Sequence, residues 1–361
     1  MSLEISVVTP TFREAENLPA LIKRIAESLH GRNYEIIVAD DVSGDNTPEV
    51  CAELEAEYPV RLLSRTTERG LSPAVIDGIA AAKGSVVVVM DADLSHPPEK
   101  IPELAAPLQN KDADFVVGSR YVQGGALAGE WPWYRRLNSW GATQFAKPLA
   151  PLADPMSGFF ALRREDMPPR ERLSPIGYKI GLEIAVKAGF SKQKFLEVPI
   201  FFDERAHGES KLTLREQLNY IRHLRRLYHH RWPKKMEAFQ FGAVGGVGFV
   251  CDALCYFGLQ ALGLPHLTAR ALAFWPSVSC NWFLNRIMTF KTRVRTSAGL
   301  QWAQFAMASL IGFCINWGAY ALLTSYVEFF AERLFLAFIA GVLAGAVFNF
   351  IIADSFIFRR K

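Results

Sequence analysis

The first 120 residues alternate between two patterns of hydrophobic and polar positions. Short runs rich in apolar and β-branched residues predict strands at 5–9, 34–39, 60–64, 85–90 and 115–118. The amphipathic stretches between them predict helices near 18–29, 48–57, 72–82 and 99–108. This order is typical of an α/β domain with a mostly parallel sheet and helices on both faces. Ligands of such sheets bind at the carboxyl ends of the strands.

The last third of the chain is instead dominated by long apolar stretches. Four of them approach the ~20 residues that cross a bilayer, and they cover about 238–262, 268–290, 302–326 and 334–358. An internal repeat relates the first and third stretches, in which Gln240-Phe241, Gly248-Phe249, Asp252 and Tyr256 recur as Gln304-Phe305, Gly312-Phe313, Asn316 and Tyr320. Asn281 and Thr289-Phe290-Lys291 similarly recur as Asn349 and Ile357-Phe358-Arg359. The sequence therefore predicts an all-α transmembrane domain of two helical hairpins.

Charge is divided unevenly between these two parts. Residues 1–233 carry 29 Lys and Arg against 31 Asp and Glu, whereas residues 234–361 carry 11 against 5. An anionic lipid surface is the expected partner of residues 234–361. Nucleic-acid binding is not predicted, because the sequence lacks the stripe of cations and stacking aromatic residues that it requires. Residues 212–235 combine a basic face with an apolar face, which predicts an amphipathic helix at the membrane interface. We therefore expect three parts: 1–211, 212–235 and 236–361.

The placement of cations also predicts an orientation. Lys291, Arg293 and Arg295 lie between the second and third stretches, and Arg359, Arg360 and Lys361 follow the fourth. By the positive-inside rule, both termini and the first domain should be cytoplasmic. The first ten residues do not have the pattern of a signal peptide. Arg286 and Asp354 occupy equivalent positions in the repeat, and we expect them to form an ion pair between helices.

Candidate chemistry begins with Asp91 and Asp93, which directly follow the apolar run 86–90. Two carboxylates at a strand end would repel each other unless a cation holds them, and their hard oxygen atoms suit Mg²⁺ or Mn²⁺. The alternative is an Asp-rich turn. A second acidic loop, 40–45, either binds a ribose or base edge or caps the helix that follows it. The absence of a glycine-rich phosphate fingerprint argues against dehydrogenases and P-loop kinases, and the acidic loops favour a nucleotide-sugar site.

Seven motifs, taken together, resemble the GT-A glycosyltransferases that make polyprenyl-phosphate sugars, and among them the dolichol- or polyprenol-phosphate mannose synthases. They are 9–12 (TPTF), 40–45 (DDVSGD), 91–98 (DADLSHPP), 118–121 (GSRY), 131–135 (WPWYR), 154–160 (DPMSGFF) and 205–211 (RAHGESK). The last third resembles the GtrA-type four-helix membrane domain that is fused to some of these enzymes. The resemblance implies a nucleotide-sugar-binding, Rossmann-like GT-A domain followed by a membrane domain.

The resemblance also implies roles for individual residues. Nucleotide-sugar contacts fall on Pro10, Phe12, Glu14, Ala39, Asp41, Asp91, Ala92, Asp93, Arg120, Arg205 and Lys211. The metal would be held by Asp93 and Asp91, with Ser95 as a weak ligand, and the acceptor phosphate by Arg120, Arg135, Ser139 and Arg205. Asp91, Asp93 and Arg120 are the expected catalytic residues. Relatives carry Pro and Gly where this chain has Gly44 and Asn46.

The implied reaction is an inverting transfer of mannose from GDP-mannose to dolichyl or polyprenyl phosphate. A phosphate monoester has a second pKa of about 6, so the attacking oxygen is ionised at neutral pH and needs no general base. Cations are needed to bring the two anionic substrates together. Two alternatives stay open: a glucosyltransferase that uses UDP-glucose, and a lipid-binding or flippase membrane protein whose first domain senses a nucleotide sugar.

Overall fold

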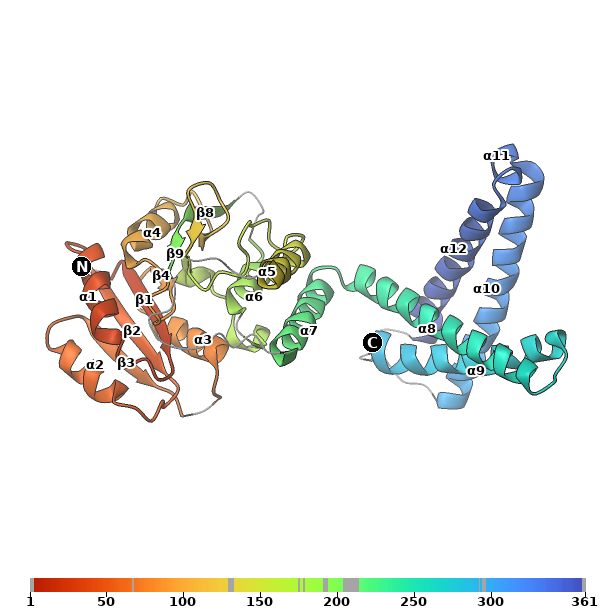
Figure 1. The fold of residues 1–361 in the computed structure, drawn as a ribbon, viewed down its shortest axis with the longest axis horizontal. Helices are drawn as coiled ribbons and strands as arrows, with labels where there is room; N and C mark the ends of the chain where they lie inside the picture. The colour runs from red at the N-terminus through yellow and green to blue at the C-terminus, as the bar shows by residue number, and fades with distance from the viewer. Residues whose placement is uncertain are drawn as a thin grey trace. The chain divides into compact units, whose positions relative to one another are not determined.

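The computed structural model describes residues 3–66, 68–128, 133–174, 176–177, 179–190, 194–203, 214–291, 293 and 297–358. The chain divides into two compact units, Met1–Arg231 and Trp232–Lys361. Figure 1 shows strands and helices in the first unit and helices in the second.

Among the described residues, a seven-stranded sheet runs through the first unit in the order β3-β2-β1-β4-β7-β5-β8. Strand β7 is antiparallel to its neighbours β4 and β5, and the remaining pairs are parallel. The strands are β1 (Ile5–Thr11), β2 (Tyr34–Asp40), β3 (Val60–Ser64), β4 (Val86–Val89), β5 (Phe115–Ser119), β7 (Phe160–Arg163) and β8 (Phe195–Pro199). A parallel pair, β6 (Ala126–Leu127) and β9 (Phe201–Phe202), lies apart from this sheet.

Helices connect the strands as the hydrophobic pattern predicts. They are α1 (Leu18–Ser28), α2 (Thr47–Glu55), α3 (Leu71–Ala81), α4 (Ile101–Gln109), α5 (Trp133–Ala146), α6 (Ile180–Lys187) and α7 (Leu214–Arg231), with 3₁₀ turns at Pro98–Lys100, Arg164–Asp166 and Arg170–Arg172. The predicted strands and the first four predicted helices are confirmed, with small shifts at their ends. Strands β7 and β8 and helices α5 and α6 were not predicted, because the regular alternation ends after β5.

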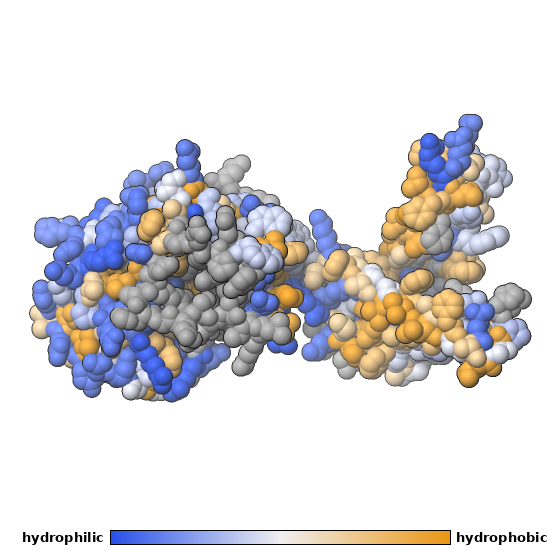
Figure 2. All heavy atoms as spheres, in the orientation of Figure 1, coloured by the Kyte–Doolittle hydropathy of each residue, from blue (hydrophilic) through white to orange (hydrophobic). Residues whose placement is uncertain are grey.

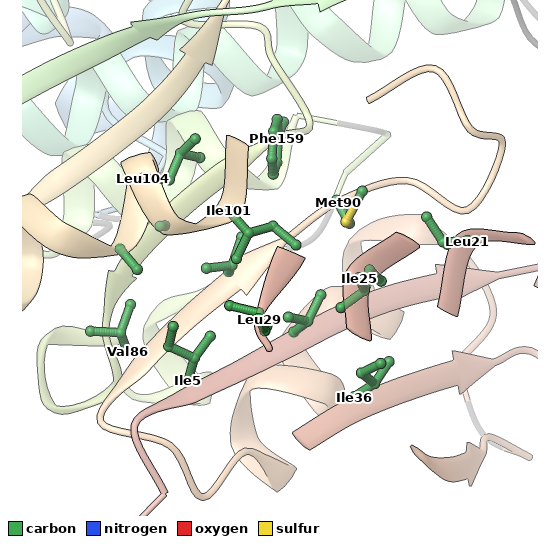
Figure 3. Packing of buried hydrophobic residues seen from close by; sticks show 14 of the residues in the cluster. Ile5, Leu21, Ile25, Leu29, Ile36, Val86, Met90, Ile101, Leu104 and Phe159 are labelled. Carbon is green, nitrogen blue, oxygen red and sulfur yellow. The ribbon is translucent and has the colours of Figure 1, made fainter. Parts of the chain in front are cut away.

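One face of the sheet is covered by α1 and α4 (Figure 3). Leu21, Ile25 and Leu29 recur at helical spacing, so one apolar side of α1 faces the sheet. They are fully buried, as are Ile101 and Leu104 of α4. Each such side chain contributes about 1.5–3 kcal/mol by leaving water. This packing anchors α1 and α4 on the sheet formed by β1, β2 and β4.

The second unit is helical. Its elements are α8 (Pro233–Ala261), α9 (His266–Leu284), α10 (Ala298–Tyr326), α11 (Glu328–Ala331) and α12 (Leu334–Ile352). Helix α8 packs against α9, and α10 packs against α12. Large apolar side chains such as Phe249, Phe257 and Phe313 are exposed on these helices. On the face shown in Figure 2, hydrophobic residues cover much of this unit, as expected of a surface in contact with lipid.

Within the described part of the chain, three helices are long and apolar enough to cross a membrane. They are α8, α10 and the segment Leu334–Ile357, which is α12 with its continuation. The fourth predicted stretch, 268–290, does form helix α9. It does not reach the same apolar composition, because Pro276, Asn281 and other polar residues interrupt it.

The predicted internal repeat is confirmed in three dimensions. Gly248 of α8 lies directly against the side chain of Asn281 in α9, and Gly312 of α10 lies in the same way against Asn349 in α12. Helices α9 and α12 each continue into a π-helical turn, at Asn285–Thr289 and Ala353–Ile357, which are equivalent positions of the repeat. The two hairpins therefore share their packing and their endings.

The predicted ion pair between Arg286 and Asp354 is wrong. The carboxylate of Asp354 lies 2.6 Å from Nη2 of Arg293, and the same nitrogen lies 2.5 Å from Glu237 of α8. Arg286 instead donates to the side-chain oxygen of Gln301. Arg293 also donates through Nη1 to the main-chain oxygen of Phe358 at 2.8 Å. It is therefore a buried link between the two hairpins rather than a solvated loop cation.

Candidate active site

The carboxyl ends of β1, β2 and β4 and the amino end of β7 bring predicted site residues to one edge of the sheet. Strands β1, β2 and β4 are parallel neighbours, so the loops after Thr11, Asp40 and Val89 leave the sheet on the same side. Strand β7 is antiparallel, so the turn 154–159 that precedes it lies at this edge as well. The two acidic segments identified in the sequence, 40–45 and that of Asp91 and Asp93, therefore lie at one edge together with the loop after β1.

The β1 and β2 ends form one side of this edge. Pro10 pairs in register with Ala39, and both are buried. The ring of Phe12 is 43% exposed, and the guanidinium of Arg13 lies 5.4 Å from its centroid. Glu14 accepts a hydrogen bond of 2.7 Å from Nδ2 of Asn17. Phe12 thus presents a flat apolar surface beside the acidic loop.

The loop after β2 is held by its own carboxylates. Asp40 accepts hydrogen bonds from Thr11 Oγ1 at 3.2 Å and from the main-chain N–H of Ser43 at 3.0 Å. Asp41 accepts from the buried guanidinium of Arg65 and from the N–H of Gly70 at 2.6 Å. Arg65 therefore neutralises Asp41 inside the protein. The sequence reasoning did not find this partner, because it lies on the loop after β3.

Asp91 and Asp93 lie in the loop after β4 and differ in their surroundings. Asp93 is 6% exposed, and one of its oxygens, Oδ1, accepts hydrogen bonds from both the main-chain N–H and the hydroxyl of Ser95. The side chain of Asp91 is 28% exposed. A Cβ added at Gly158 would lie 3.1 Å from Oδ2 of Asp91, so this glycine makes room for the carboxylate. Ser95 orients Asp93 here, and Ala92 between the two acids is buried.

These donors fit a divalent cation. Among the described residues no Lys or Arg lies within ion-pair distance of Asp91. A partly exposed carboxylate without a cationic partner, one residue away from a second carboxylate, is the oxygen donor set that Mg²⁺ and Mn²⁺ prefer. In the described part of the chain, no three His, Cys, Asp or Glu side chains are placed to share a metal. Asp91 and Asp93 are the candidate oxygen donors at this edge.

His96 lies at this edge as well, although the sequence analysis did not assign it to the site. It is 2% exposed, and its Nδ1 accepts a hydrogen bond of 3.1 Å from the main-chain N–H of Asp91. Burial lowers the pKa of His96 below its ordinary value, against the opposing influence of Asp91 and Asp93. The ring is therefore neutral at physiological pH, as its role as an acceptor requires.

Arg120 follows β5 and forms a salt bridge with the buried carboxylate of Asp154. Its Nε and Nη2 donate to Asp154 at 2.7 and 2.9 Å, and its main-chain N–H donates to the same side chain at 3.2 Å. Asp154 is fully buried, and its own N–H donates to Glu197 at 3.0 Å. Burial is the largest single influence and lowers the pKa of Arg120, but the hydrogen bonds and charge of Asp154, together with Tyr121 and Asp91, raise this pKa above its ordinary value. The sequence analysis did not predict this pair.

The residues predicted for the acceptor phosphate continue onto α5. The hydroxyl of Ser139 is 2.9 Å from that of Tyr121, the residue after Arg120. Helix α5 is joined to α7 by hydrogen bonds from Tyr220 and Tyr228 to the main-chain oxygens of Ala142 and Phe145, at 2.7 and 2.8 Å. Apolar side chains on both helices are exposed: Trp133, Leu137, Trp140, Phe145, Leu218 and Ile221. The periodicity of α5 alone did not predict this surface.

Three predicted site residues cannot be placed. Arg205 and Lys211 lie outside the described residues. Arg135 belongs to α5, but its side chain lies outside the described part.

Comparison with known proteins identifies both units. Residues 6–167 match the family model of glycosyl transferase family 2, and residues 240–358 match that of the GtrA/DPMS transmembrane domain. The chain is 43% identical over 326 residues to the dolichol-phosphate mannosyltransferase of Pyrococcus furiosus. The aligned region covers 89% of this chain and 91% of the relative. It is 38% identical to the dolichol-phosphate mannosyltransferase of Saccharomyces cerevisiae, over 74% of this chain and 99% of the relative.

Among solved structures, glucosyl-3-phosphoglycerate synthase from Mycobacterium tuberculosis, in complex with Mn²⁺ and UDP, matches 63% of this chain and 80% of its own with 24% identity and a TM-score of 0.48. The two matched domains agree with the α/β unit and the membrane helices described above. The identity to the archaeal relative extends over nearly the full length of both proteins. The chain therefore belongs to the dolichol-phosphate mannosyltransferase family.

Proposed function

We propose that this protein transfers mannose from GDP-mannose to dolichyl or polyprenyl phosphate and releases GDP. One observation carries the proposal beyond family membership: the carboxylates of Asp91 and Asp93 share a sheet edge with the Arg120–Asp154 pair. An acidic pair suits the metal that accompanies a diphosphate, and a fixed guanidinium suits a phosphate monoester. One edge thus offers complementary chemistry to both substrates.

At the donor end, the nucleoside would lie on the loops after β1 and β2. Phe12 offers an exposed ring for a base, with Pro10, Glu14 and Ala39 beside it. A carboxylate can accept about four hydrogen bonds, so Asp41 keeps acceptor capacity for the nucleoside after binding Arg65 and Gly70. Lys211 and Arg205 would add positive charge toward the donor.

The donor diphosphate would meet Asp91, Ala92 and Asp93. Asp93 would bind the metal directly, with Asp91 as a second donor, and Ser95 would hold Asp93 in place. A bound Mg²⁺ or Mn²⁺ would neutralise the diphosphate and so help GDP to leave.

The acceptor phosphate would bind to Arg120, Arg135, Ser139 and Arg205. Its oxygen attacks the anomeric carbon of mannose, and the bond from that carbon to the GDP oxygen breaks on the opposite face, so the configuration inverts. Because the phosphate is already ionised, none of these residues has to remove a proton. Their task is to offset repulsion between two anionic substrates, and Asp154 keeps the Arg120 fork aligned for it.

We further infer that the second unit crosses the membrane four times, with both termini and the transferase unit on the cytoplasmic side. Helix α9 (19 residues) and its π-helical turn (5 residues) together run from His266 to Thr289, which equals the 24 residues of the segment Leu334–Ile357, and α9 packs against α8. The exposed Lys291 and the basic C-terminal residues 359–361 support the orientation.

The test is a transfer assay on purified protein in lipid vesicles that contain dolichyl phosphate. Labelled GDP-mannose should give lipid-linked mannose, and unlabelled GDP-mannose should compete far better than UDP-glucose. Chelation of the metal, or Asp93→Ala, should abolish transfer. Lipid-linked glucose without lipid-linked mannose would favour the glucosyltransferase, and nucleotide binding without any lipid product would favour a sensor or flippase.

A further inference from the structure

His96 lies between the carboxylate loop and the acceptor side of the site. Its Nδ1 accepts the N–H of Asp91 at 3.1 Å, and the side chain is 2% exposed. A protonated imidazole has no acceptor nitrogen, so this hydrogen bond requires the neutral ring with its hydrogen on Nε2. Removing the acceptor would leave the Asp91 N–H without a partner inside the protein.

The same ring packs against two aromatic side chains. It stacks on Phe159 with a centroid distance of 5.3 Å and meets Phe202 edge-on at 5.4 Å. Phe159 directly follows Gly158, whose Cα faces the carboxylate of Asp91. The imidazole therefore fixes the main chain of Asp91 against the turn that also bounds its side chain.

Phe202 links this cluster to the acceptor cation. The guanidinium of Arg120 lies 5.1 Å from the centroid of the Phe202 ring. His96 contacts the same ring. Asp154 accepts a hydrogen bond from the same guanidinium. A continuous series of contacts thus runs from Asp91 through His96 and Phe202 to Arg120. The main-chain N–H of Asp203 donates to the oxygen of Ser95 at 3.1 Å, which ties β9 to the carboxylate loop a second time.

We propose that His96 is a positioning residue for the transfer reaction. It sets the Asp91 main chain through Nδ1 and sets the spacing between the metal-binding carboxylates and Arg120 through its ring. This inference rests on the proposed function, since it assigns His96 to a site where a metal-bound donor meets an anionic acceptor. The imidazole acts through its neighbours, because it is buried among Asp91, Phe159 and Phe202.

Two substitutions separate the two contacts of the ring. His96→Phe keeps an aromatic ring but removes the acceptor for Asp91. His96→Asn keeps an acceptor at the place of Nδ1 but removes the ring. The exposed His30, changed to Phe and to Asn in the same way, is the matched control. The full-length protein in vesicles is assayed for the Mn²⁺ concentration at half-maximal rate and for KM of each substrate, and its Tm is measured with and without MnCl₂ and GDP.

His96→Phe should raise the Mn²⁺ concentration at half-maximal rate roughly 10-fold, because loss of a hydrogen bond that supports a metal ligand typically has an effect of this size. It should also reduce the Tm increase that MnCl₂ and GDP produce. His96→Asn should keep the Mn²⁺ requirement near that of the wild type and raise KM for the lipid acceptor. A folded His96→Phe variant with wild-type Mn²⁺ dependence and a wild-type Tm increase would overturn the inference. Failure of the wild type to use GDP-mannose would instead overturn the proposed function, while the Tm measurements would still test His96.

Discussion

Phe290 and Phe358 stack on each other with ring centroids 4.6 Å apart and an interplanar angle of 19°. They occupy equivalent positions at the ends of the two hairpins, each directly after a π-helical turn. The two copies of the repeat therefore meet through the same residue from each copy. Arg293 reinforces this junction, because it lies 4.5 Å from the Phe290 centroid and donates to the main-chain oxygen of Phe358.

The glycines that face asparagines should be necessary for hairpin packing. Gly248→Ala and Gly312→Ala would each place a methyl group against Asn281 or Asn349, with a loss of about 1–3 kcal/mol in stability. Gly245→Ala and Gly318→Ala are the controls, because nothing lies within 4 Å of the added methyl group. These controls should be neutral or gain up to ~1 kcal/mol from helix propensity. Thermal unfolding in detergent measures both pairs, and equal effects would contradict the packing.

Arg293 should be the most costly cation to remove from the second unit. Truncation by Arg293→Ala removes the ion pairs with buried Glu237 and with half-buried Asp354, with an expected loss of about 3–5 kcal/mol. Arg333 pairs with Glu332 at 3.6 Å near the surface, and Arg333→Ala should change stability by less than about 1 kcal/mol. Unfolding in detergent compares the two, and similar losses would show that burial of the Arg293 cluster is not what stabilises it.

Gly158 should be needed for Asp91. A methyl group at this position would lie 3.1 and 3.2 Å from the two carboxylate oxygens, so Gly158→Ala should displace Asp91 and lower the transfer rate roughly 10-fold by weakening metal binding. Added Mn²⁺ should restore part of the loss. Gly141→Ala on α5, where the methyl group meets nothing within 4 Å, should retain the wild-type rate and Mn²⁺ dependence. A wild-type Mn²⁺ dependence in Gly158→Ala would argue against the role of Asp91.

Asp154 should act through Arg120. Asp154→Asn removes the negative charge and one of the two oxygens that accept hydrogen bonds from Arg120. We therefore expect kcat/KM for the lipid acceptor to fall by on the order of 10², with KM for GDP-mannose nearly unchanged. Asp114→Asn breaks a comparable pair with Arg163, at 2.6 Å in the same unit. This control should affect stability without a selective effect on the acceptor. An equal rise of both KM values in Asp154→Asn would contradict the assignment.

Local pattern was sufficient for much of the fold. The alternation up to residue 120 correctly predicted β1 to β5 and α1 to α4, because buried parallel strands are nearly continuous apolar runs. The repeat likewise predicted two hairpins. The pattern could not predict β7 and β8, which are short and follow irregular loops, nor the apolar surface of α5, where exposure depends on what packs beside the helix.

The sequence by itself determined the donor set and its location: two carboxylates after β4 and a second acidic loop after β2 must share an edge once the strands are parallel. Only the tertiary structure decided the partners. Each of these contacts joins residues that are brought together only when the chain folds. They are Arg65 with Asp41, Asp154 with Arg120, Arg293 with Asp354, and His96 with Asp91. Charge and hydrogen-bonding capacity are local properties of a residue, whereas pairing depends on distance and burial. For this reason the motifs identified the chemistry, and the fold selected the contacts that hold it in place.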